Sequence, residues 1–390
     1  MAKDLSALLG TIQKELGGAI DVTPMGELET PYADRMPFGI FDMDAALKGG
    51  LPRGTLCQLF GPDGVGKNLL AYMLMARAQE RWGDDVNILY MSFGYAADTP
   101  FMRKCGVRIA YSDSELQQAG IDPATATDLQ RGRTVGNVLT FGITDKDLAA
   151  EQPAEALLTA AIRSVESCDI HLVVIDEMAS GETGDDVKKG LHETVKMATW
   201  ASLVTQFSRK LYTALRKKDA EGHPNSTALL ALQPVRANMD AYSAKFRPHN
   251  IPSGHALKHL KAIDVHLSMA GFLTEGSDRE KVGKKVKWKI DKGKFGLSEG
   301  AEGEFEFRFF GPGGTGGIDQ VELLADTAAA WGTILRRGAN YYFLDYDNAV
   351  KGRDAMLAYL RDQDELRAEL SEATMHAACT STPYARQGGA

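Results

Sequence analysis

The sequence has few cysteines, no long apolar run and no excess of positive charge. Its four cysteines, Cys57, Cys105, Cys168 and Cys379, show no paired spacing, which argues against a disulfide framework or a zinc site and favours a reducing cytoplasm. No stretch approaches the ~20 apolar residues of a membrane span. The formal net charge is −8, so any contact with nucleic acid needs local basic loops. We therefore expect a cytoplasmic protein without a membrane partner.

The central part of the chain alternates apolar strands with helices. After Gly54 come the strand TLCQLF, a glycine-rich loop, the helical run LLAYMLMARAQERW and the strand VNILYMSF. Further on, HLVVID (171–176) and STALLALQ stand on either side of a long helix at about 191–218, and VKWKI and EFEFRFF form a β-rich region. This alternation predicts an α/β fold whose mostly parallel sheet is covered by helices on both faces.

Shorter segments precede and follow this core. Residues 4–17 carry leucine and isoleucine at helical spacing and precede a polar tether, so this amphipathic helix packs either on a neighbouring subunit or on its own chain. Residues 318–390 follow the glycine run GPGGTGG and indicate a small, mainly helical domain with a polar tail. Two long loops, 111–138 and 237–254, interrupt the core, and loops of that length are usually functional or disordered.

The segment GPDGVGKN lies between an apolar strand and a helix, which is the context in which GxxxxGK forms a phosphate-binding loop. Its glycines let backbone N–H groups converge on phosphate oxygens, and Lys67 reaches the β and γ phosphates. A glycine-rich turn with a surface lysine is the much weaker alternative. The nucleotide ligands expected here are Gly61, Pro62, Asp63, Gly64, Val65, Gly66, Lys67, Asn68 and Leu69.

Asn68 stands where this loop usually has Ser or Thr, whose hydroxyl binds Mg²⁺. Its amide oxygen can bind the metal or a metal-bound water, but its N–H₂ can also be turned toward the metal. The strand HLVVIDE ends on Asp176 and Glu177, at the sheet edge where phosphate and metal bind. We expect Asp176 and Asn68 to hold Mg²⁺. Glu177 is either a base that orients water or a solvated residue at a strand end.

A series of segments resembles, in the same order, the bacterial RecA and phage UvsX recombinases. They are LSALLGTIQKELGGAI, FGIFDMDAALKGGLPRGTLCQLFGPDGVGK, AADTPFMRKCGV, VVID, ALLALQPVR, SGHALKHL, DKGK and RRGANYYF. The resemblance covers most of the chain and implies a RecA-like P-loop ATPase core at 36–310, with an insertion at about 111–138. It also implies an N-terminal segment, 1–35, whose helix docks on the next protomer of a filament, and a small α+β C-terminal domain at 318–390. The departures from the bacterial pattern make a phage source our working hypothesis.

Several family roles carry over by position. Asp98 and Phe101 correspond to the adenine-side residues, where a ring stacks on the base. Gln233 corresponds to the glutamine that senses the γ-phosphate and opens the second DNA loop, and Lys292 and Lys294 correspond to lysines that reach the ATP of the neighbouring protomer. Phe101 can instead belong to the core and the two lysines to a solvated turn, whereas Gln233 at an apolar strand end has no such plain alternative.

One family position does not match. The catalytic glutamate after the second strand falls on Gly94, and the aspartate two residues earlier falls on Ser92. A glycine cannot orient water, so we expect nucleotide binding to survive better than hydrolysis. Other P-loop ATPases place the base directly after the aspartate of the later strand, and our hypothesis is that Glu177 compensates for Gly94. The expected catalytic residues are Lys67, Glu177 and Gln233.

The resemblance places two DNA-binding loops after the strands that end at Asp176 and Gln233. The first, near SGETGDDVKKGLHETVK, carries two lysines among acids, and by itself a solvated loop is the stronger interpretation. The second, 237–254, is richer in cations and aromatics, which suit phosphates and bases, and it ends in a helix N-terminus. The expected DNA contacts are Lys188, Lys189, Arg236, Lys245, Phe246, Arg247, Ser253 and Gly254.

These observations predict an ATP-dependent recombinase that forms helical filaments on single-stranded DNA and promotes pairing and strand exchange with duplex DNA. ATP and Mg²⁺ are the expected cofactors. Further copies of this chain, both forms of DNA, and mediator and single-strand-binding proteins are the expected partners. The alternative is a filament or regulatory protein that binds ATP and DNA but hydrolyses ATP poorly. The insertion contacts a neighbour, covers the nucleotide or is a plain surface excursion, and the sequence leaves these three open.

Overall fold

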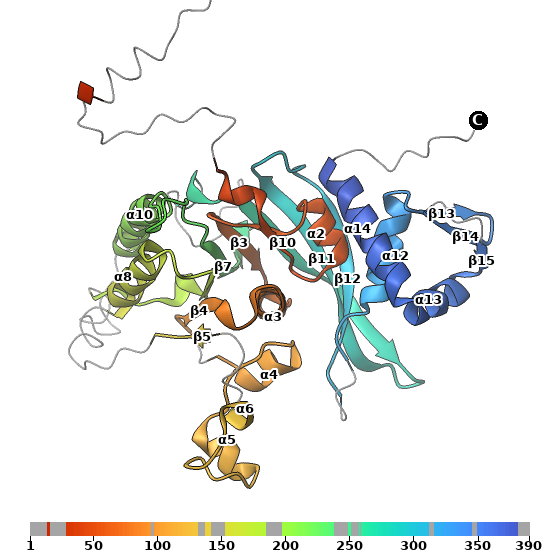
Figure 1. The fold of residues 1–390 in the computed structure, drawn as a ribbon, viewed down its shortest axis with the longest axis horizontal. Coiled ribbons are helices and arrows are strands. Elements are labelled where there is room, and N and C mark those ends of the chain that lie inside the picture. Colours follow the sequence, from red (N-terminus) through yellow and green to blue (C-terminus); the bar gives the residue numbers. More distant parts are fainter. Residues whose placement is uncertain are drawn as a thin grey trace, which may run out of the picture.

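An eight-stranded sheet forms the centre of the molecule (Figure 1). The computed structural model describes residues 14–15, 29–94, 97–131, 137–141, 153–184, 197–237, 249–250, 257, 259–311, 316–344 and 349–380. The strand order is β12-β11-β10-β3-β7-β6-β4-β5. Neighbours from β10 to β5 are parallel, whereas β11 and β12 are antiparallel to the strands beside them. The predicted α/β fold with a mostly parallel sheet is confirmed. The strands are β3 (Leu56–Gly61), β4 (Asn87–Ser92), β5 (Asn137–Leu139), β6 (Leu172–Asp176), β7 (Ala228–Pro234), β10 (Ile263–Glu275), β11 (Glu280–Gly293) and β12 (Glu302–Arg308).

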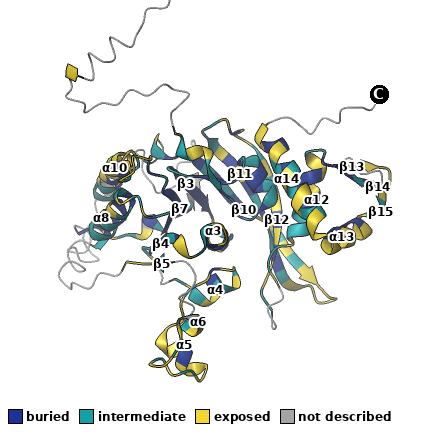
Figure 2. Ribbon diagram, in the orientation of Figure 1, coloured by how far each residue is buried: buried dark blue, intermediate teal, exposed yellow. Residues whose placement is uncertain are grey.

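Strands β3, β6 and β7 are buried along almost their whole length because both of their faces are apolar. Successive residues face opposite layers. On β6, Val174 joins the core cluster that includes α3 (Lys67–Trp82), whereas Val173 and Ile175 join the cluster that includes α8 (Pro153–Glu166) and α10 (Met197–Ala214). Figure 2 shows the buried residues concentrated in the strands and on the inner helix faces. Helices therefore close the core on both sides of the sheet.

The segment that leads into the sheet is fixed by a buried carboxyl group. It contains the 3-10 helix η2 (Pro31–Ala33), the antiparallel pair β1 (Arg35–Met36) and β2 (Leu51–Pro52), and α2 (Phe41–Ala46). Asp44 of α2 is 2% exposed and accepts hydrogen bonds from the backbone N–H groups of Phe38, at 2.7 Å, and Gly39, at 2.8 Å. Burial raises the pKa of Asp44 to about 8. Both of its oxygens thus stabilise the backbone of this segment.

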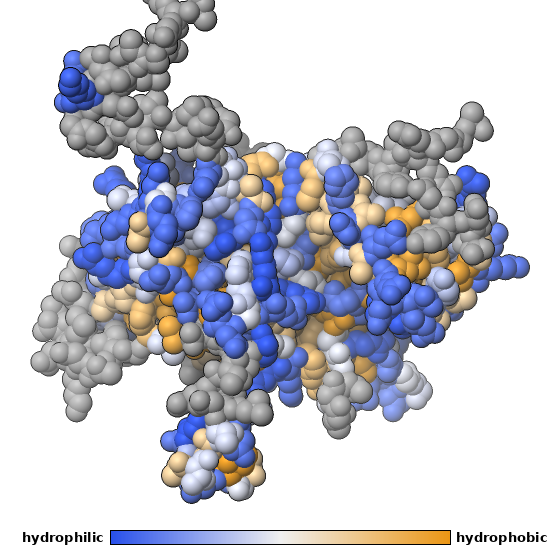
Figure 3. Space-filling view, viewed as in Figure 1, coloured by the Kyte–Doolittle hydropathy of each residue, from blue (hydrophilic) through white to orange (hydrophobic). Residues whose placement is uncertain are grey.

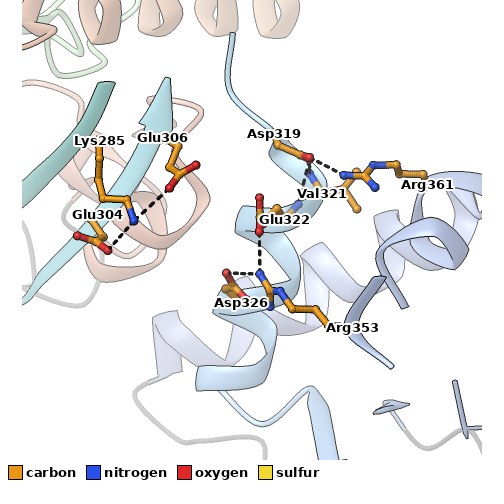
Figure 4. A network of polar contacts seen from close by, with 9 residues as sticks. All are labelled: Lys285, Glu304, Glu306, Asp319, Val321, Glu322, Asp326, Arg353 and Arg361. Atoms are coloured by element: carbon orange, nitrogen blue, oxygen red, sulfur yellow. Dashed lines mark hydrogen bonds and ion pairs between the residues drawn. The ribbon is translucent and has the colours of Figure 1, made fainter. Parts of the chain in front are cut away.

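Beyond β12 the chain forms a smaller unit of helices and strands. A three-stranded antiparallel sheet, β13 (Ile334–Arg337), β14 (Asn340–Phe343) and β15 (Ala349–Lys351), accompanies α12 (Gln320–Ala330), α13 (Arg353–Asp362) and α14 (Asp364–Thr380). Its apolar side chains form a cluster of their own, against which Phe41 of α2 packs. Arg353 forms ion pairs with Glu322 and Asp326, and Arg361 pairs with Asp319, so α13 is held to α12 (Figure 4). The sequence pattern alone indicated mainly helices, and the sheet adds the β part.

The described part of the insertion is folded rather than extended. Helices α4 (Thr99–Lys104), α5 (Asp113–Gln118) and α6 (Asp128–Arg131) project together from the body of the molecule (Figure 1). Ser112 and Glu115 form a capping box at the start of α5. Arg103 of α4 pairs with Glu115 and stacks on Tyr111 at 4.3 Å. These contacts tie the insertion to α4.

A short ladder lies just beyond β7. Strands β8 (Arg236–Ala237) and β9 (His249–Asn250) pair antiparallel and bring together the two ends of segment 238–248. Two further 3-10 turns, η3 (Gly83–Asp85) and η4 (Met178–Ser180), follow α3 and β6.

Of the expected helix at 4–17, only residues 14–15 lie within the described residues, and they are helical. Among the described residues no helix is long and apolar enough to cross a membrane. Hydrophilic side chains cover much of the face in Figure 3, with hydrophobic patches beside the C-terminal helices.

Candidate nucleotide site

The carboxyl ends of four parallel strands bring the predicted site residues together. In the sheet register, Ser92 of β4 pairs with Asp176 of β6, and Asp176 pairs with Leu232 of β7. One residue further along β7, Gln233 pairs with Phe60 of β3, immediately before Gly61. The phosphate-binding loop, Asp176 and Gln233 therefore lie side by side at one edge of the sheet, where parallel α/β sheets bind ligands.

The loop itself has the backbone that phosphate binding needs. Gly64 and Gly66 adopt φ angles of +69° and +107°, a region that suits glycine, and α3 begins directly after them at Lys67. The Lys67 ammonium donates hydrogen bonds to the carbonyl oxygens of Gly61 and Pro62, each at 2.9 Å. Burial lowers the pKa of Lys67, against the opposing effect of nearby carboxylates. A cation and a set of backbone N–H groups thus face the same small space.

Asp176 is 6% exposed, and its two oxygens differ in their contacts. Oδ2 accepts hydrogen bonds from the Tyr90 hydroxyl at 2.7 Å and from the Asn68 amide nitrogen at 3.0 Å. Oδ1 is buried and has no hydrogen-bond partner among the described residues. Burial raises the pKa of Asp176, and the donors from Tyr90 and Asn68 oppose that rise. One carboxylate oxygen is therefore held in place while the other is left for a ligand.

The donor set at this position fits Mg²⁺. Magnesium prefers oxygen ligands and is commonly held by one or two protein carboxylates together with phosphate oxygens and water, and Asp176 Oδ1 is a buried oxygen of that kind. Asn68 directs its amide nitrogen to Asp176, so only its amide oxygen is available to a metal. Asn68, which stands in place of the usual Ser or Thr, thus makes a hydrogen bond to Asp176 at the position where a hydroxyl would be expected to bind Mg²⁺.

The Glu177 carboxylate lies directly beside Gly94. A Cβ atom built on Gly94 would lie 2.7 Å from Glu177 Oε2. The Ser180 hydroxyl donates to the same oxygen at 3.2 Å, and the backbone of Glu177 is left-handed, with φ 50° and ψ 47°. Left-handed backbone at a non-glycine residue is sparsely populated and often marks a functional position. The absent side chain at Gly94 therefore makes room for the Glu177 carboxylate.

Gln233 is the most enclosed polar group at this edge. It is 0% exposed, and neither its amide nitrogen nor its amide oxygen has a hydrogen-bond partner among the described residues. An unpaired buried amide is costly, of the order of 1–3 kcal/mol, so a structural purpose does not explain it. Its position beside Gly61 makes a phosphate or a bound water the fitting partner.

The expected base-binding residues lie on α4 and in the turn before it. The Asp98 carboxylate accepts the backbone N–H of Phe101 at 3.0 Å and so caps the helix. The half-buried Phe101 ring meets Tyr72 at 5.8 Å and Phe310 at 6.1 Å, both edge to face. Asp98 thus has a local structural contact, and the Phe101 ring is itself only partly buried.

Lys292 and Lys294 lie toward the opposite end of the sheet. In the register, Lys292 pairs with Asp264, which pairs with Gln58 near the start of β3, three residues before the loop begins at Gly61. Their ammonium groups donate to the carbonyl oxygens of Lys261, at 2.7 Å, and His259, at 3.1 Å. The structure therefore does not bring these lysines to the nucleotide site of their own chain.

Most of the expected DNA contacts lie outside the described residues: Lys188, Lys189, Lys245, Phe246, Arg247, Ser253 and Gly254. The backbone of Arg236 is described and pairs with Asn250 in the β8–β9 ladder. This ladder starts three residues after Gln233. The candidate nucleotide site is thus joined by a very short backbone segment to the predicted DNA loop.

Sequence reasoning missed Tyr90 and Ser180. Tyr90 lies two residues before Ser92 on β4, and the alternation of a strand puts both side chains on one face, so its proximity to Asp176 could have been inferred from pairing of β4 with β6. The contact of Ser180 with Glu177 depends on the left-handed turn at Glu177 and has no sequence signal that we can identify.

A parallel sheet, a glycine loop that leads into a helix, and an acid on a nearby strand end define a P-loop nucleotide-binding protein. A family model described as the RecA N-terminal domain matches residues 3–119. The chain is 26% identical over 371 residues to Protein RecA of Aquifex pyrophilus, covering 94% of this chain and 90% of that protein. It is 27% identical over 379 residues to Protein RecA of Thermus aquaticus, covering 94% and 92%. The chain is thus similar to RecA proteins over nearly its full length, and its N-terminal part matches the RecA N-terminal domain model. A phage source stays a prediction.

Proposed function

We propose that this chain is an ATP-dependent recombination protein that forms helical filaments on single-stranded DNA and promotes pairing and strand exchange. Similarity to RecA proteins over 94% of the chain supports this function. The single observation that carries the link between ATP and DNA is Gln233, a buried amide without a partner among the described residues. It lies beside the phosphate loop and three residues before the β8–β9 ladder. A γ-phosphate that engages Gln233 would bias the position of this ladder, and with it the predicted DNA loop.

In this proposal the nucleotide is held by the chain's own loop. Lys67 exchanges its contacts with the Gly61 and Pro62 carbonyls for the β and γ phosphates, and the N–H groups of the loop bind the same oxygens. Asp176 and the Asn68 amide oxygen would hold Mg²⁺, which when bound neutralises charge on the phosphates. Asp98 and Phe101 bind the adenine side.

Glu177 acts as the base that orients and deprotonates the attacking water. Its carboxylate lies in the space that a side chain at position 94 would take, and Ser180 steadies one of its oxygens. The catalytic glutamate of the family is therefore replaced in space, although not in sequence. This supports catalysis by Lys67, Glu177 and Gln233 together. The rate of hydrolysis then depends on how well Glu177 replaces the glutamate that is missing at position 94.

Glu177→Gln tests this assignment. DNA-stimulated ATP turnover is expected to fall by about 10²- to 10⁴-fold, the usual contribution of a general base, while ATP affinity stays unchanged. Glu280→Gln, at the tip of the β10–β11 hairpin, is the matched control. The exchange Gly94→Glu with Glu177→Gly restores part of the turnover, because the carboxylate returns to the same space. Unchanged turnover in Glu177→Gln would refute the role of Glu177.

Lys292 and Lys294 act on the nucleotide of the neighbouring protomer. Their place far from their own loop supports action across a head-to-tail interface, in which segment 1–35 docks on the next copy of the core, 36–310, with 318–390 as an outer domain. Subunits carrying Lys67→Ala and subunits carrying Lys292→Met with Lys294→Met should each be inactive. Their equal mixture should regain about a quarter of the DNA-stimulated turnover, because one interface in four combines the intact halves. A mixture without activity would show that the lysines do not act in trans.

Function is tested on one preparation by three measurements. Electron microscopy with single-stranded DNA and a non-hydrolysable ATP analogue should show an extended helical filament, and a homologous pairing assay should yield joint molecules with duplex DNA. ATP turnover is measured in parallel. Absence of filaments contradicts the proposal. Filaments without pairing or turnover favour the alternative, an ATP-binding regulatory filament. The specific support for this alternative is that Asn68 and Gly94 replace residues expected to take part in hydrolysis. Mediator and single-strand-binding proteins are then sought as partners.

A further inference from the structure

Strand β11 carries lysines on both of its faces, and they have different partners. Lys285 forms ion pairs with Glu306 at 3.1 Å and with Glu304 at 3.6 Å (Figure 4). Lys287 pairs with Glu302 at 2.9 Å, and Lys289 is 3.7 Å from Asp291. These three lysines balance the acids of β12 and β11 itself. Lys284 lies on the other face, because successive residues of a strand alternate.

Lys284 reaches the phosphate-binding loop. Its ammonium donates a hydrogen bond to the carbonyl oxygen of Gly64 at 2.6 Å, across 220 residues of sequence. A Cβ built on Gly64 would lie 3.7 Å from the same nitrogen. No carboxylate of the described residues forms an ion pair with Lys284. The nearest acid of the loop, Asp63, is instead 3.8 Å from Lys67 and is 86% exposed. Lys284 therefore brings a positive charge to the loop that its own surroundings do not neutralise.

The contact of Lys284 with the loop resembles that of Lys67. Both ammonium groups donate to loop carbonyls, Lys67 to Gly61 and Pro62 and Lys284 to Gly64. Carbonyl oxygens are neutral acceptors, and a hydrogen bond to a charged phosphate oxygen is stronger. Each lysine thus donates to a neutral carbonyl oxygen of the loop, a contact that a phosphate oxygen can replace.

Lys284 also lies toward the expected base side of the site. Its ammonium is 5.8 Å from the centre of the Phe309 ring, and the next residue, Phe310, meets Phe101 at 6.1 Å. Phe101 is the ring expected beside the base. Lys284 thus contacts the loop that receives the phosphates and also Phe309, the residue next to the ring that meets Phe101.

We propose that Lys284 is a second phosphate-binding cation, which binds the polyphosphate of the nucleotide held by its own chain. This inference rests on the proposed function, because it requires the loop to bind a nucleoside polyphosphate. Lys284 takes no part in bond making. It adds a charge-assisted hydrogen bond to a phosphate oxygen on the side of the loop that faces β11.

The test measures ADP and adenosine binding to the full chain by displacement of a fluorescent ADP analogue. Lys284→Met should weaken ADP binding by about 10- to 100-fold, as expected for loss of a hydrogen bond between charged groups, and leave adenosine binding unchanged. Lys284→Arg should retain ADP affinity within a few-fold, because the charge is kept. Lys285→Met, on the opposite face of the same strand, should bind ADP as the unaltered chain does.

The outcomes separate the two proposals. Equal ADP affinity in Lys284→Met and the unaltered chain overturns this inference alone. An equal loss of ADP and adenosine affinity also overturns it. Adenosine has no phosphate, so losing a phosphate contact cannot weaken its binding. If the unaltered chain binds no ADP analogue, the proposed function fails, and this inference fails with it.

Discussion

Asp44 and Asp176 are both almost fully buried acids, yet they differ in how their oxygens are used. In the segment that leads into the sheet, each Asp44 oxygen accepts one backbone N–H. At the carboxyl edge of the sheet, one Asp176 oxygen accepts two donors, and the other has no partner among the described residues. Burial raises the pKa of both.

The difference lies in what each carboxyl group completes. Asp44 satisfies backbone donors that would otherwise be buried without an acceptor, so it contributes to stability. Asp176 is held by Tyr90 and Asn68 in an orientation that leaves an oxygen unused, and the fold gains nothing from that oxygen. Raised pKa and burial do not separate the two acids, whereas the count of partners per oxygen does.

Asp176→Asn should have the largest effect on activity. The amide oxygen can replace Oδ2 as acceptor for Tyr90 and Asn68, while the amide nitrogen replaces the oxygen that is free for Mg²⁺. Turnover of ATP should fall by about 10²- to 10³-fold, since metal stabilisation of transition-state charge is worth several kcal/mol.

The midpoint of thermal unfolding is the matching control for Asp176→Asn. It should stay the same or rise, because the variant removes the cost of burying a charge. A clear drop in the midpoint would place Asp176 with Asp44, as a residue needed by the fold.

Asp44→Asn should show the opposite pattern. An amide offers one acceptor where the carboxyl group offers two, so one N–H of Phe38 or Gly39 loses its partner. The free energy of unfolding should fall by about 1–3 kcal/mol, measured by urea denaturation. ADP affinity should be unchanged, and a loss of affinity with stability intact would contradict the structural role.

The contribution of Asp44 to stability should depend on pH. The Asp44 pKa is about 8 in the folded chain and about 3.8 in the unfolded one, so between these values the folded state holds a proton that the unfolded state has released. Stability from this group is full below pH ~4 and is lost as pH rises through ~8. The stability difference between the unaltered chain and Asp44→Asn should shrink from pH 5 to pH 8. A constant difference would argue against the raised pKa.

The smallest effect is expected from Asn68→Thr. A hydroxyl can bind Mg²⁺ and still contact Asp176, so turnover should rise a few-fold, equivalent to less than about 1 kcal/mol, with ATP affinity little changed. Steady-state turnover in Mg²⁺ checks this. A fall in turnover would mean that the Asn68 hydrogen bond to Asp176 is itself required.

Much of the fold and part of the site could be predicted because their signals are local. The apolar runs of β3, β6 and β7 predict buried parallel strands, and their last residues mark the sheet edge where Gly61, Asp176 and Gln233 meet. The glycines at 64 and 66 likewise predict a loop before α3. Each of these inferences needs only a short stretch of sequence.

The contacts that decide chemistry join distant parts of the chain and have no local signal. The Asn68 amide meets Asp176 across 108 residues, and Lys284 meets Gly64 across 220. The overlap between Glu177 and position 94 depends on the left-handed backbone at Glu177. A sequence shows that Gly94 lacks a carboxylate, but only the fold shows which carboxylate fills the space.

The β8–β9 ladder pairs the residues that flank segment 238–248 of the predicted DNA loop. Because Arg236 pairs with Asn250 and Ala237 pairs with His249, both ends of segment 238–248 are tied to one another. Bringing two ends of a segment together has an entropic cost that these pairs have already met. In the proposed function, a displacement that starts at Gln233 therefore reaches Arg236 and, through the ladder, its partner Asn250.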